Sequence, residues 1–394
     1  MRPVPGATAN RACVGVPDNR GLTVAVLGPA SSVHVQRWTT MLSGIGYRVI
    51  VASWQPGPEL ADAELRVAPA VSASPVQRVP RAAVWLRRMI RDVRPDIVHI
   101  HSLGVHGALA LALPRGPAQV VTPWGSELRA ARNSVARASV VRSAARRAGL
   151  VLPTSPSVAA EMIDRYAVSP ARVRVFSWGV DEALIAAHPS IAPGPVRASV
   201  GIPADATVVL SVRSTAAVYR TLEIVSSFAR AAADRPDLFL VMLGGHRPDR
   251  ESARRAKDDY LDRIRDASSA IRDRFLIIED PLTPKETFEV MCASDIAVSI
   301  PAGDQRSSSV LEAALAGCRL LLSDIAPYRE MISDGLAAEL LSEPVTSSLT
   351  EHLRRVTANE SISHSNKQFI LTKENGAIKA CELDRIYRNL VSRE

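Results

Sequence analysis

The chain has 394 residues, of which 47% are hydrophobic and 22% charged, a balance that excludes a mainly disordered protein. No apolar run approaches the ~18 residues that a membrane-spanning helix needs, and the first twenty residues lack the apolar stretch of a secretory signal. We therefore expect a cytoplasmic protein with two or three domains, preceded by a disordered tail at residues 1–20.

The charge is unevenly distributed. Residues 1–200 hold 23 Arg, no Lys and 11 acidic residues, a net charge of about +12, whereas the remainder holds 25 basic and 29 acidic residues. The basic half suits an anionic partner such as nucleic acid, a lipid surface or a phosphorylated substrate, or it reflects Arg on solvated helix faces. Aromatic residues make up only 4% and do not interleave with the Arg clusters, so we expect no nucleic acid.

The first half alternates apolar runs with amphipathic stretches. The run 22–27 predicts a buried strand, and Trp38, Met41, Leu42 and Ile45 then recur at helical spacing. Further strands are predicted at 47–53, 96–100, 119–122, 150–153 and 173–176, and helices around 80–93, 133–147 and 156–165. This alternation predicts an α/β domain with a parallel sheet over residues 21–190.

Residues 188–197 contain three prolines and a glycine without periodicity, which is typical of a hinge. After it, strands are predicted at 207–212, 238–243, 275–279, 296–300 and 319–323, and helices around 221–234, 251–270, 284–292 and 309–316. We expect a second doubly wound domain over residues 191–365 and terminal helices over 366–394. In two such domains facing each other, ligands bind at the carboxyl ends of the strands.

The loops after the first-domain strands contain candidate binding residues. Gly28, Ser31 and His34 follow the first strand and open a helix, whose N-terminus suits an anion or is a plain connection. We expect His99 and His101 on opposite faces of one strand, so that only His101 would line the cleft.

Trp124 and Glu127 follow another strand of the first domain. They would form a wall for a polar acceptor, or an ordinary turn with an exposed carboxylate. The four cysteines, Cys13, Cys292, Cys318 and Cys381, form no C-x-x-C pair and have no His at metal-ligand spacing. We therefore expect neither a zinc site nor a disulfide, in a reducing compartment.

The sequence lacks the motifs that are typical of several enzyme classes. The sequence contains no G-x-G-x-x-G dinucleotide fingerprint, no G-x-x-x-x-G-K-[ST] phosphate loop and no G-x-S-x-G nucleophile elbow. Dinucleotide-dependent oxidoreductases, P-loop NTPases and serine hydrolases are therefore not favoured.

The most informative stretch is PAGDQRSSSVLEAALAG at residues 301–317. Asp304 and three serines precede a predicted helix, in which Ser309 and Glu312 have the S-x-x-E spacing of a capping box, with Gly317 at its end. Hydroxyls and free amides at the positive end of a helix suit a diphosphate. Glu312 would otherwise only cap its own helix.

Two cations accompany this stretch. Arg213 ends the first strand of the second half, and Arg220 follows seven residues later. A cation at the carboxyl end of a strand would neutralise phosphate through charge-assisted hydrogen bonds, or would be an ordinary surface Arg.

With these motifs the chain resembles the retaining nucleotide-sugar glycosyltransferases of family 4, whose GT-B fold consists of two facing Rossmann-like domains and a C-terminal helix that crosses back. The similarity spans roughly residues 22–390. It is carried by VLGPASSVHVQRWTTMLSGIGYRV, DIVHIHSLG, VVTPWGSEL, FSWGVD, LSVRSTAAVY, VMLGG and, most specifically, DQRSSSVLEAALAGCRLLLSDIAPYREMISDG.

The resemblance implies roles for particular residues. The family's E-x7-E pair looks like Asp304 and Glu312, with Glu312 on the nucleotide ribose and Asp304 on the donor sugar, and both are implied to be catalytic together with Arg213. The donor would also be bound by a wider set: Gly28, Arg213, Arg220, Leu282, Ser307, Ser308 and Ser309. The acceptor would be bound by Ser31, His34, His101, Trp124 and Glu127.

The sequence departs from the family at two positions. The family's second cation, usually Lys, is replaced by Arg220 or Tyr219, and Trp124 stands where many members have a His that approaches the donor sugar.

The implied reaction is transfer of a sugar from a UDP- or GDP-linked donor to a hydroxyl of a glycan, lipid-linked or natural-product acceptor. It would retain the anomeric configuration and use no metal, in agreement with the absence of a D-x-D in a metal-binding setting. Alternatives are a sugar-nucleotide epimerase of the same architecture, a degenerate nucleotide-sugar-binding protein, and a nucleic-acid-binding protein suggested by charge alone.

The arginines around residues 81–94 flank apolar residues in a basic amphipathic pattern. This pattern suits peripheral contact with anionic lipid at the inner face of a membrane, or an ordinary solvated helix. The Arg- and Ala-rich, Lys-poor composition suggests a high-GC bacterium.

Overall fold

The computed structural model describes residues 21–60, 62–69, 75–245, 251–356 and 360–392. These residues form two compact units: unit 1 contains those up to Trp178 and from Gly376 on, and unit 2 is Gly179–Asn375. The chain thus changes units after Trp178 and after Asn375, whereas the sequence placed these changes near residues 190 and 365. The expected tail at 1–20 lies outside the described residues.

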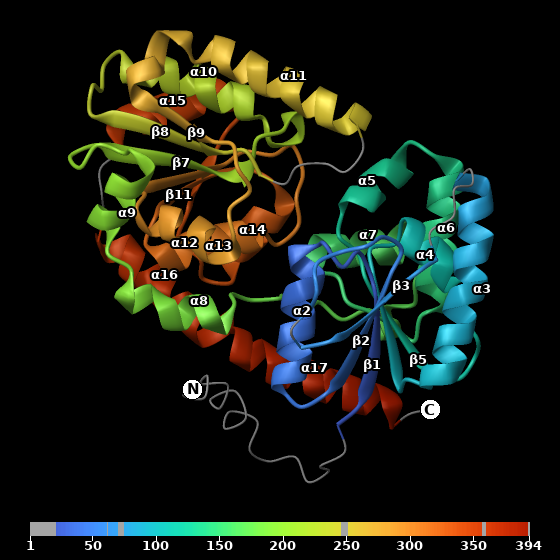
Figure 1. The fold of residues 1–394 in the computed structure, drawn as a ribbon. Helices are drawn as coiled ribbons and strands as arrows, with labels where there is room; N and C mark the ends of the chain where they lie inside the picture. The colour runs from blue at the N-terminus through green and yellow to red at the C-terminus, as the bar shows by residue number, and fades with distance from the viewer. Residues whose placement is uncertain (1–20, 61, 70–74, 246–250, 357–359, 393–394) are drawn as a thin grey trace. The chain divides into compact units, whose positions relative to one another are not determined.

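Unit 1 contains a six-stranded parallel sheet in the order β3-β2-β1-β4-β5-β6 (Figure 1). The strands are β1 (Thr23–Leu27), β2 (Arg48–Ser53), β3 (Glu64–Val67), β4 (Ile97–His101), β5 (Ala118–Thr122) and β6 (Leu150–Val151). The helices are α2 (Val33–Gly44), α3 (Pro75–Val93), α4 (Val105–Ala110), α5 (Ser126–Arg132), α6 (Val135–Arg147), α7 (Pro156–Asp164) and α17 (Gly376–Val391).

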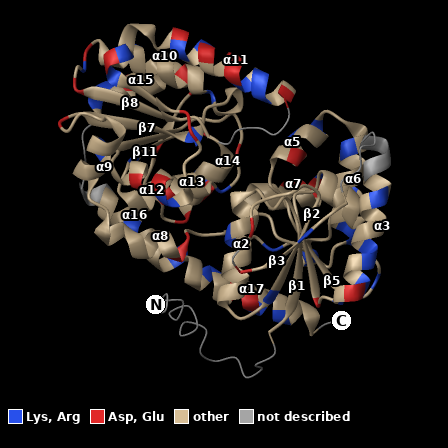
Figure 2. Cartoon of the chain, viewed as in Figure 1, with Lys and Arg blue, Asp and Glu red and all other residues tan. Residues whose placement is uncertain are grey.

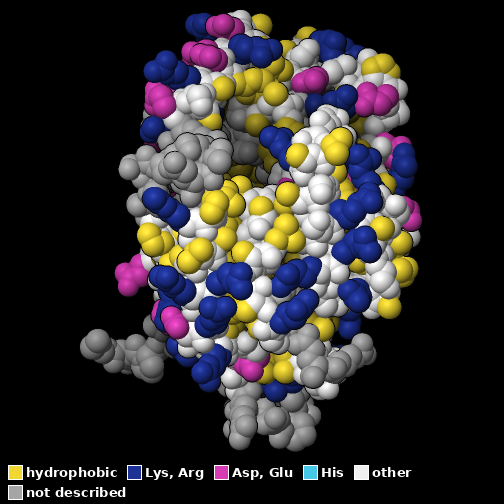
Figure 3. All heavy atoms as spheres, turned by 90° about the vertical axis from the view of Figure 1, so that its right-hand side faces the viewer, with side chains coloured by type: hydrophobic (Ala, Val, Ile, Leu, Met, Phe, Trp, Pro, Cys, Tyr) yellow, Lys and Arg dark blue, Asp and Glu magenta, His cyan; other side chains and the backbone are white. Residues whose placement is uncertain are grey.

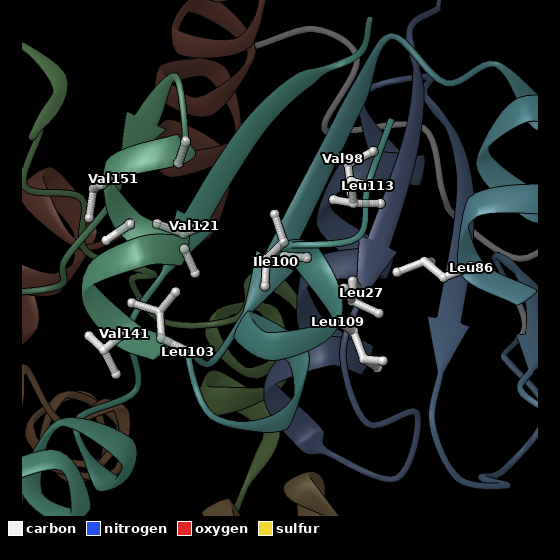
Figure 4. Close-up of a cluster of buried hydrophobic side chains, with 14 of the residues drawn as sticks. Leu27, Leu86, Val98, Ile100, Leu103, Leu109, Leu113, Val121, Val141 and Val151 are labelled. Atoms are coloured by element: carbon white, nitrogen blue, oxygen red, sulfur yellow. The ribbon is translucent and has the colours of Figure 1, made fainter. Parts of the chain in front are cut away.

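The prediction of a buried parallel sheet in this unit is confirmed. Along β1, Val24 and Val26 join one core cluster while Ala25 and Leu27 join another, because successive side chains point to opposite faces. Helices cover both faces, so β1 is an uninterrupted apolar run. Figure 4 shows part of the cluster under α3, α4 and α6, including Leu27, Leu86, Ile100, Leu109, Val121 and Val141.

Two strand predictions differ from the structure. The segment 173–176 forms only an isolated bridge between Val173 and Val151, because β6 is just two residues long. The sequence missed β3, whose residues ELRV carry two charges. Such composition is normal for an edge strand, which has a pairing neighbour on one side only.

Helix α17, at the C-terminal end, belongs to unit 1. Its Leu383, Ile386 and Tyr387 lie in one core cluster with Trp38 of α2. Tyr387 is fully buried and its hydroxyl accepts a hydrogen bond of 3.3 Å from Trp38 Nε1 and contacts His99 Nδ1 at 2.5 Å. Leu383, Ile386 and Tyr387 are thus buried, whereas Ile378 is 44% exposed.

Unit 2 repeats the architecture with the order β12-β11-β10-β7-β8-β9. Its strands are β7 (Thr207–Ser214), β8 (Leu238–Leu243), β9 (Phe275–Ile278), β10 (Ile296–Ser299), β11 (Arg319–Ser323) and β12 (Glu339–Leu341). When the strands are numbered within each unit, both sheets have the order 3-2-1-4-5-6. This is the strand order of dinucleotide-binding Rossmann domains.

The helices of unit 2 are α8 (Glu182–Ala187), α9 (Pro193–Val200), α10 (Thr221–Ala232), α11 (Glu251–Ala267), α12 (Pro284–Cys292), α13 (Ser308–Ala316), α14 (Ala326–Ser333), α15 (Val345–Arg355) and α16 (Glu360–Lys373). Buried residues of α12, α13, α14 and α16 cover one face of the sheet, and those of α10, α11 and α15 cover the other. The expected hinge at 188–197 lies inside unit 2, where it leads into α9.

None of the described helices is long and apolar enough to cross a membrane. The expectation of no disulfide is wrong, because Cys381 of α17 is disulfide-bonded, whereas Cys292 and Cys318 are free.

Removing the Tyr387 hydroxyl tests how firmly α17 is held. In Tyr387→Phe the buried Trp38 Nε1 and His99 Nδ1 lose their shared partner, which should lower the free energy of unfolding by about 1–3 kcal/mol. Urea unfolding followed by circular dichroism measures this change. Ile378→Ala, on the exposed part of the same helix, is the control and should change stability by less than about 0.5 kcal/mol.

Candidate functional site

The loop from β10 to α13 presents the polar residues of the motif that the sequence singled out. Helix α13 begins at Ser308 with Ser307 as its N-cap, and it ends at Gly317, whose φ of 95° is in the left-handed region that favours glycine. The predicted capping box of Ser309 and Glu312 is therefore wrong, because Ser309 already lies inside the helix. The Ser307 side chain makes no capping bond. It binds a cation instead.

That cation is Arg213, near the end of β7. Its Nη1 donates a hydrogen bond of 2.6 Å to Ser307 Oγ, and its Nη2 donates one of 3.0 Å to Tyr219 Oη. The guanidinium also lies 4.4 Å from the centre of the Tyr219 ring, a cation–π contact. Arg213 is thus fixed by hydrogen bonds and stacking, at the beginning of α13.

Asp304 provides the counter-charge. Its Oδ2 lies 3.5 Å from Arg213 Nη1 and accepts a hydrogen bond of 2.9 Å from Tyr328 Oη. Its Oδ1 accepts from the backbone N–H of Gln305, and the Tyr328 hydroxyl is 2.8 Å from Ser299 Oγ. The side chains of Arg213 and Asp304 are only 17% and 14% exposed. The carboxylate that the sequence assigned to the donor sugar is thus engaged within the protein, where it orients Arg213.

The electrostatics of this cluster keep Arg213 charged. Burial alone would lower the pKa of its guanidinium, but the nearby Asp304 and the Tyr219 and Tyr328 hydroxyls more than offset this, so the pKa is raised. Burial, with Asp304 beside it, raises the pKa of Tyr328 well above its ordinary value, so this tyrosine remains a neutral donor. A fixed cation next to a helix N-terminus is suited to an anion.

The other expected donor residues lie in different surroundings. Arg220 has a φ of 55° and its Nη1 binds Glu343 Oε1 at 2.8 Å, so Tyr219 rather than Arg220 joins Arg213. Leu282, in the loop after β9, packs partly buried against the core of unit 2. Ser308, Ser309 and Glu312 are half-buried on the first turns of α13.

The expected acceptor residues belong to unit 1. Ser31 is exposed in the loop between β1 and α2, where Ser32 caps the helix by accepting from the His34 N–H. Gly28 precedes this loop, and a Cβ there would lie 2.8 Å from Val35 and 3.2 Å from His101. A side chain at position 28 would therefore displace its neighbours, which explains the glycine without reference to a ligand.

The expectation for the two histidines of β4 is wrong. His99 and His101 lie two residues apart, so their side chains point to the same face of the strand, with ring centroids 4.5 Å apart. His99 Nε2 contacts Thr122 Oγ1 at 2.7 Å, and its Nδ1 contacts Tyr387. Both rings are fully buried, and burial lowers the pKa of His99 to about 3.

His101 is unusual because neither ring nitrogen has a hydrogen-bond partner in the structure. Burial, with His99, His34 and His106 nearby, holds its pKa well below the ordinary value, so the ring is neutral. Aromatic rings surround it: Trp38 at 4.9 Å, Trp124 at 6.0 Å and Trp178 at 6.4 Å between centroids. His34 joins the same group, 4.5 Å from Trp178.

Glu127 is buried rather than exposed on a turn. Its Oε1 accepts hydrogen bonds from the backbone N–H groups of Trp124 at 2.8 Å and Leu103 at 3.1 Å. Burial raises its pKa, against the opposite effect of these hydrogen bonds. Glu127 thus ties the loop after β4 to the start of α5 and places Trp124 beside His101 and His34.

Among the described residues there is no group of three or more His, Cys, Asp or Glu side chains that could hold a metal ion.

Comparison with known proteins shows which family and which solved structures the chain resembles. Residues 31–184, most of unit 1, match the family model Glycosyltransferase Family 4. Sucrose-phosphate synthase from Thermosynechococcus elongatus superposes with a TM-score of 0.76 at 15% identity, covering 95% of this chain and 100% of that one. HepE from Anabaena, in complex with UDP and glucose, has a TM-score of 0.76 at 14% identity and covers 93% of this chain and 100% of its own. The chain has no match among curated proteins.

The chain has the two-domain architecture of the GT-B fold, and residues 31–184 match glycosyltransferase family 4. A glycosyltransferase from Rickettsia africae has the same architecture, with a TM-score of 0.72 at 14% identity over 95% of this chain and 100% of that one. The expected fold class is therefore confirmed, and the match over residues 31–184 agrees with the expected family.

Neutralising Asp304 tests its role as the counter-ion of Arg213. Asp304→Asn keeps the acceptor for Tyr328 but leaves Arg213 without its charge partner, which should lower the free energy of unfolding by about 1–3 kcal/mol. Asp324→Asn removes the partner of the exposed Arg329 and should change little. Equal melting temperatures of both variants, by differential scanning calorimetry, would contradict the assignment.

Proposed function

We propose that the protein is a metal-independent, retaining glycosyltransferase that uses a nucleotide-sugar donor. The observation that carries this proposal is the cluster of Arg213, Asp304 and Ser307 at the N-terminus of α13. It combines a fixed cation with the free backbone N–H groups of a helix, which is the chemistry that binds a diphosphate.

The cluster would act on the leaving group. As the bond between the sugar and the diphosphate breaks, negative charge accumulates on the phosphate oxygens. Arg213 is already held at the α13 N-terminus by Ser307 and Tyr219, so the two groups would stabilise this charge without reorganisation. The acceptor hydroxyl attacks the anomeric carbon on the face from which the diphosphate departs, and its proton passes to the departing phosphate oxygen. The configuration at that carbon is retained.

The nucleotide would be held by neighbouring groups of unit 2. Glu312, on the first turns of α13, is the proposed acceptor for ribose hydroxyls, and Ser308 and Ser309 offer hydroxyls beside it. Asp304 is proposed to act mainly through Arg213, since both of its oxygens are engaged. Solved structures of HepE contain UDP or UDP-glucose, which supports UDP as the first nucleotide to test.

We propose that the acceptor binds at the loops of unit 1 that follow β1, β4 and β5. The exposed Ser31 and the rings of His34, Trp124 and Trp178 provide one hydroxyl and apolar ring surfaces there. Rings of this kind stack on the apolar faces of sugars and of other cyclic acceptors. The acceptor class remains a hydroxyl-bearing glycan, lipid-linked molecule or natural product.

A basic surface of unit 1 supports a membrane-linked acceptor in the cytoplasm. The apolar side of α3 is used in the core, where Ala82, Leu86, Met89 and Ile90 are buried. Arg81, Arg87, Arg88 and Arg91 of α3 are exposed, as are several arginines of α6, and Figures 2 and 3 show Lys and Arg spread over this side of the unit with few acidic residues. The proposed contact is therefore electrostatic, with anionic headgroups at the inner face of a bacterial membrane, and not insertion of α3.

Nucleotide binding is the first test. UDP or GDP at 100 times its Kd should stabilise the native protein by about 2.7 kcal/mol, seen as a rise in melting temperature that EDTA does not remove. Arg213→Met should abolish this rise, whereas the control Arg329→Met, in an exposed ion pair, should keep it. The proposal fails if no nucleotide stabilises the wild type.

Product analysis separates the alternatives. With the donor identified and an acceptor supplied, NMR of the new glycosidic bond should show the anomeric configuration of the donor. An epimerase would instead convert the sugar nucleotide without any acceptor. A degenerate binding protein would bind the nucleotide and turn nothing over.

Vesicle binding tests the basic surface. Reversal of Arg87, Arg88 and Arg91 to Glu should weaken co-sedimentation with phosphatidylglycerol vesicles at least 10²-fold, since each cation contributes about 1 kcal/mol near an anionic surface. Raising the salt concentration should weaken wild-type binding in the same direction. The matched control reverses the exposed Arg255, Arg263 and Arg272 of unit 2. Equal loss in both triple variants would refute a specific surface.

A further inference from the structure

Arg306 makes a buried ionic contact in the loop before α13. Its side chain is 6% exposed, with Nη2 2.6 Å from Glu374 Oε1 and Nη1 2.6 Å from Asp334 Oδ2. Glu374 is only 3% exposed, whereas Asp334 is 49% exposed. A carboxylate buried to this degree is costly unless it is paired, so Arg306 and Glu374 require each other.

The backbone of Arg306 belongs to the donor loop. It lies between Asp304 and Ser307, the two residues of this loop that contact Arg213. The position of the Arg306 main chain therefore determines where the Ser307 hydroxyl and the N-terminus of α13 are held. A side-chain anchor at Arg306 fixes this part of the loop from outside the phosphate site.

The other partner stands where the chain passes between its units. Glu374 is next to Asn375, the last residue of unit 2, and its carbonyl accepts a hydrogen bond of 2.7 Å from the Val180 N–H. Val180 itself pairs with Asn375 in an isolated parallel bridge, two residues after Trp178, the end of the first part of unit 1. Both covalent connections between the units therefore run side by side at Glu374.

We infer that Arg306 is a positioning residue that fastens the donor loop to the paired connections between the units. This inference rests on the proposed function of the loop as a diphosphate site. A buried ion pair commonly gives little net stability compared with apolar residues of similar volume, but it fixes a definite geometry. Here the geometry fixed is that of Ser307, and through it the direction in which Arg213 presents its charge.

The test compares Arg306→Met, which keeps the length of the side chain but removes its charge, with Arg306→Lys and Glu374→Gln. Arg329→Met, which breaks the exposed pair with Asp324, is the control. Hydrogen exchange without any ligand should show faster exchange in Arg306→Met for peptides covering 301–310 and 178–182. Peptides covering the buried strand β11 should be unchanged.

Binding and turnover give the second measurement. In Arg306→Met the Kd for UDP, or for whichever nucleotide the wild type binds, should rise about tenfold, and kcat at saturating donor should fall about 10²-fold because a misplaced charge stabilises the transition state poorly. Arg306→Lys, which can reach one carboxylate, should recover part of both losses. Arg329→Met should match the wild type.

The outcomes separate this inference from the function on which it rests. If Arg306→Met exchanges, binds and turns over as the wild type does and only melts earlier, Arg306 is merely structural and the inference is overturned. If the wild type binds no nucleotide, the proposed function fails, and the exchange of 301–310 and 178–182 alone decides whether Arg306 joins the two segments. If Arg306→Met does not fold, Glu374→Gln, which keeps an acceptor for Arg306, is used for the same comparison.

Discussion

The organisation of unit 2 around its polar loop depends on one charge, the guanidinium of Arg213 near the end of β7. A cation so little exposed must be compensated, and Asp304, Ser307 and Tyr219 are all oriented by that requirement. Tyr328 and Ser299 are oriented in turn by Asp304. The result is a preorganised cation at a helix N-terminus. The Asp304 carboxylate lies 3.5 Å from this cation, too far for a strong hydrogen bond, so the guanidinium can also bind a more highly charged anion.

Unit 1 is organised by burial rather than charge. Its sheet has the same strand order, but the carboxyl ends of β1 and β4 carry Gly28 and His101 in place of a cation. The neutral histidines, the three tryptophans and Tyr387 form one packed group of rings behind these ends. The two units thus offer different chemistry at equivalent positions of the same topology, as expected where fold and function are separable.

The sequence was informative where periodicity or a motif was strong. The apolar runs of β1, β7 and β10 and the loop before α13 were all found from pattern alone. It failed where side-chain direction or distant partners decided the outcome. His99 and His101 share one face of β4 instead of lying on opposite faces, the N-cap position of α13 is Ser307 and not Ser309, and Tyr328 carries no local signal that it bonds Asp304. Arg306 and Glu374 are 68 residues apart, so no local pattern could join them.

The folding of unit 1 depends on the order in which the chain is synthesised, because α17 belongs to its core but follows unit 2 in the sequence. Three side chains of its core, Leu383, Ile386 and Tyr387, are synthesised only after all of unit 2. A nascent chain that has emerged only to residue 178 has the strands of unit 1 but lacks the α17 side chains that join Trp38, Val24 and Val26 in one core cluster. This core cluster of unit 1 is therefore completed only after unit 2 has been synthesised, and a chain that stops before α17 leaves apolar residues open to aggregation.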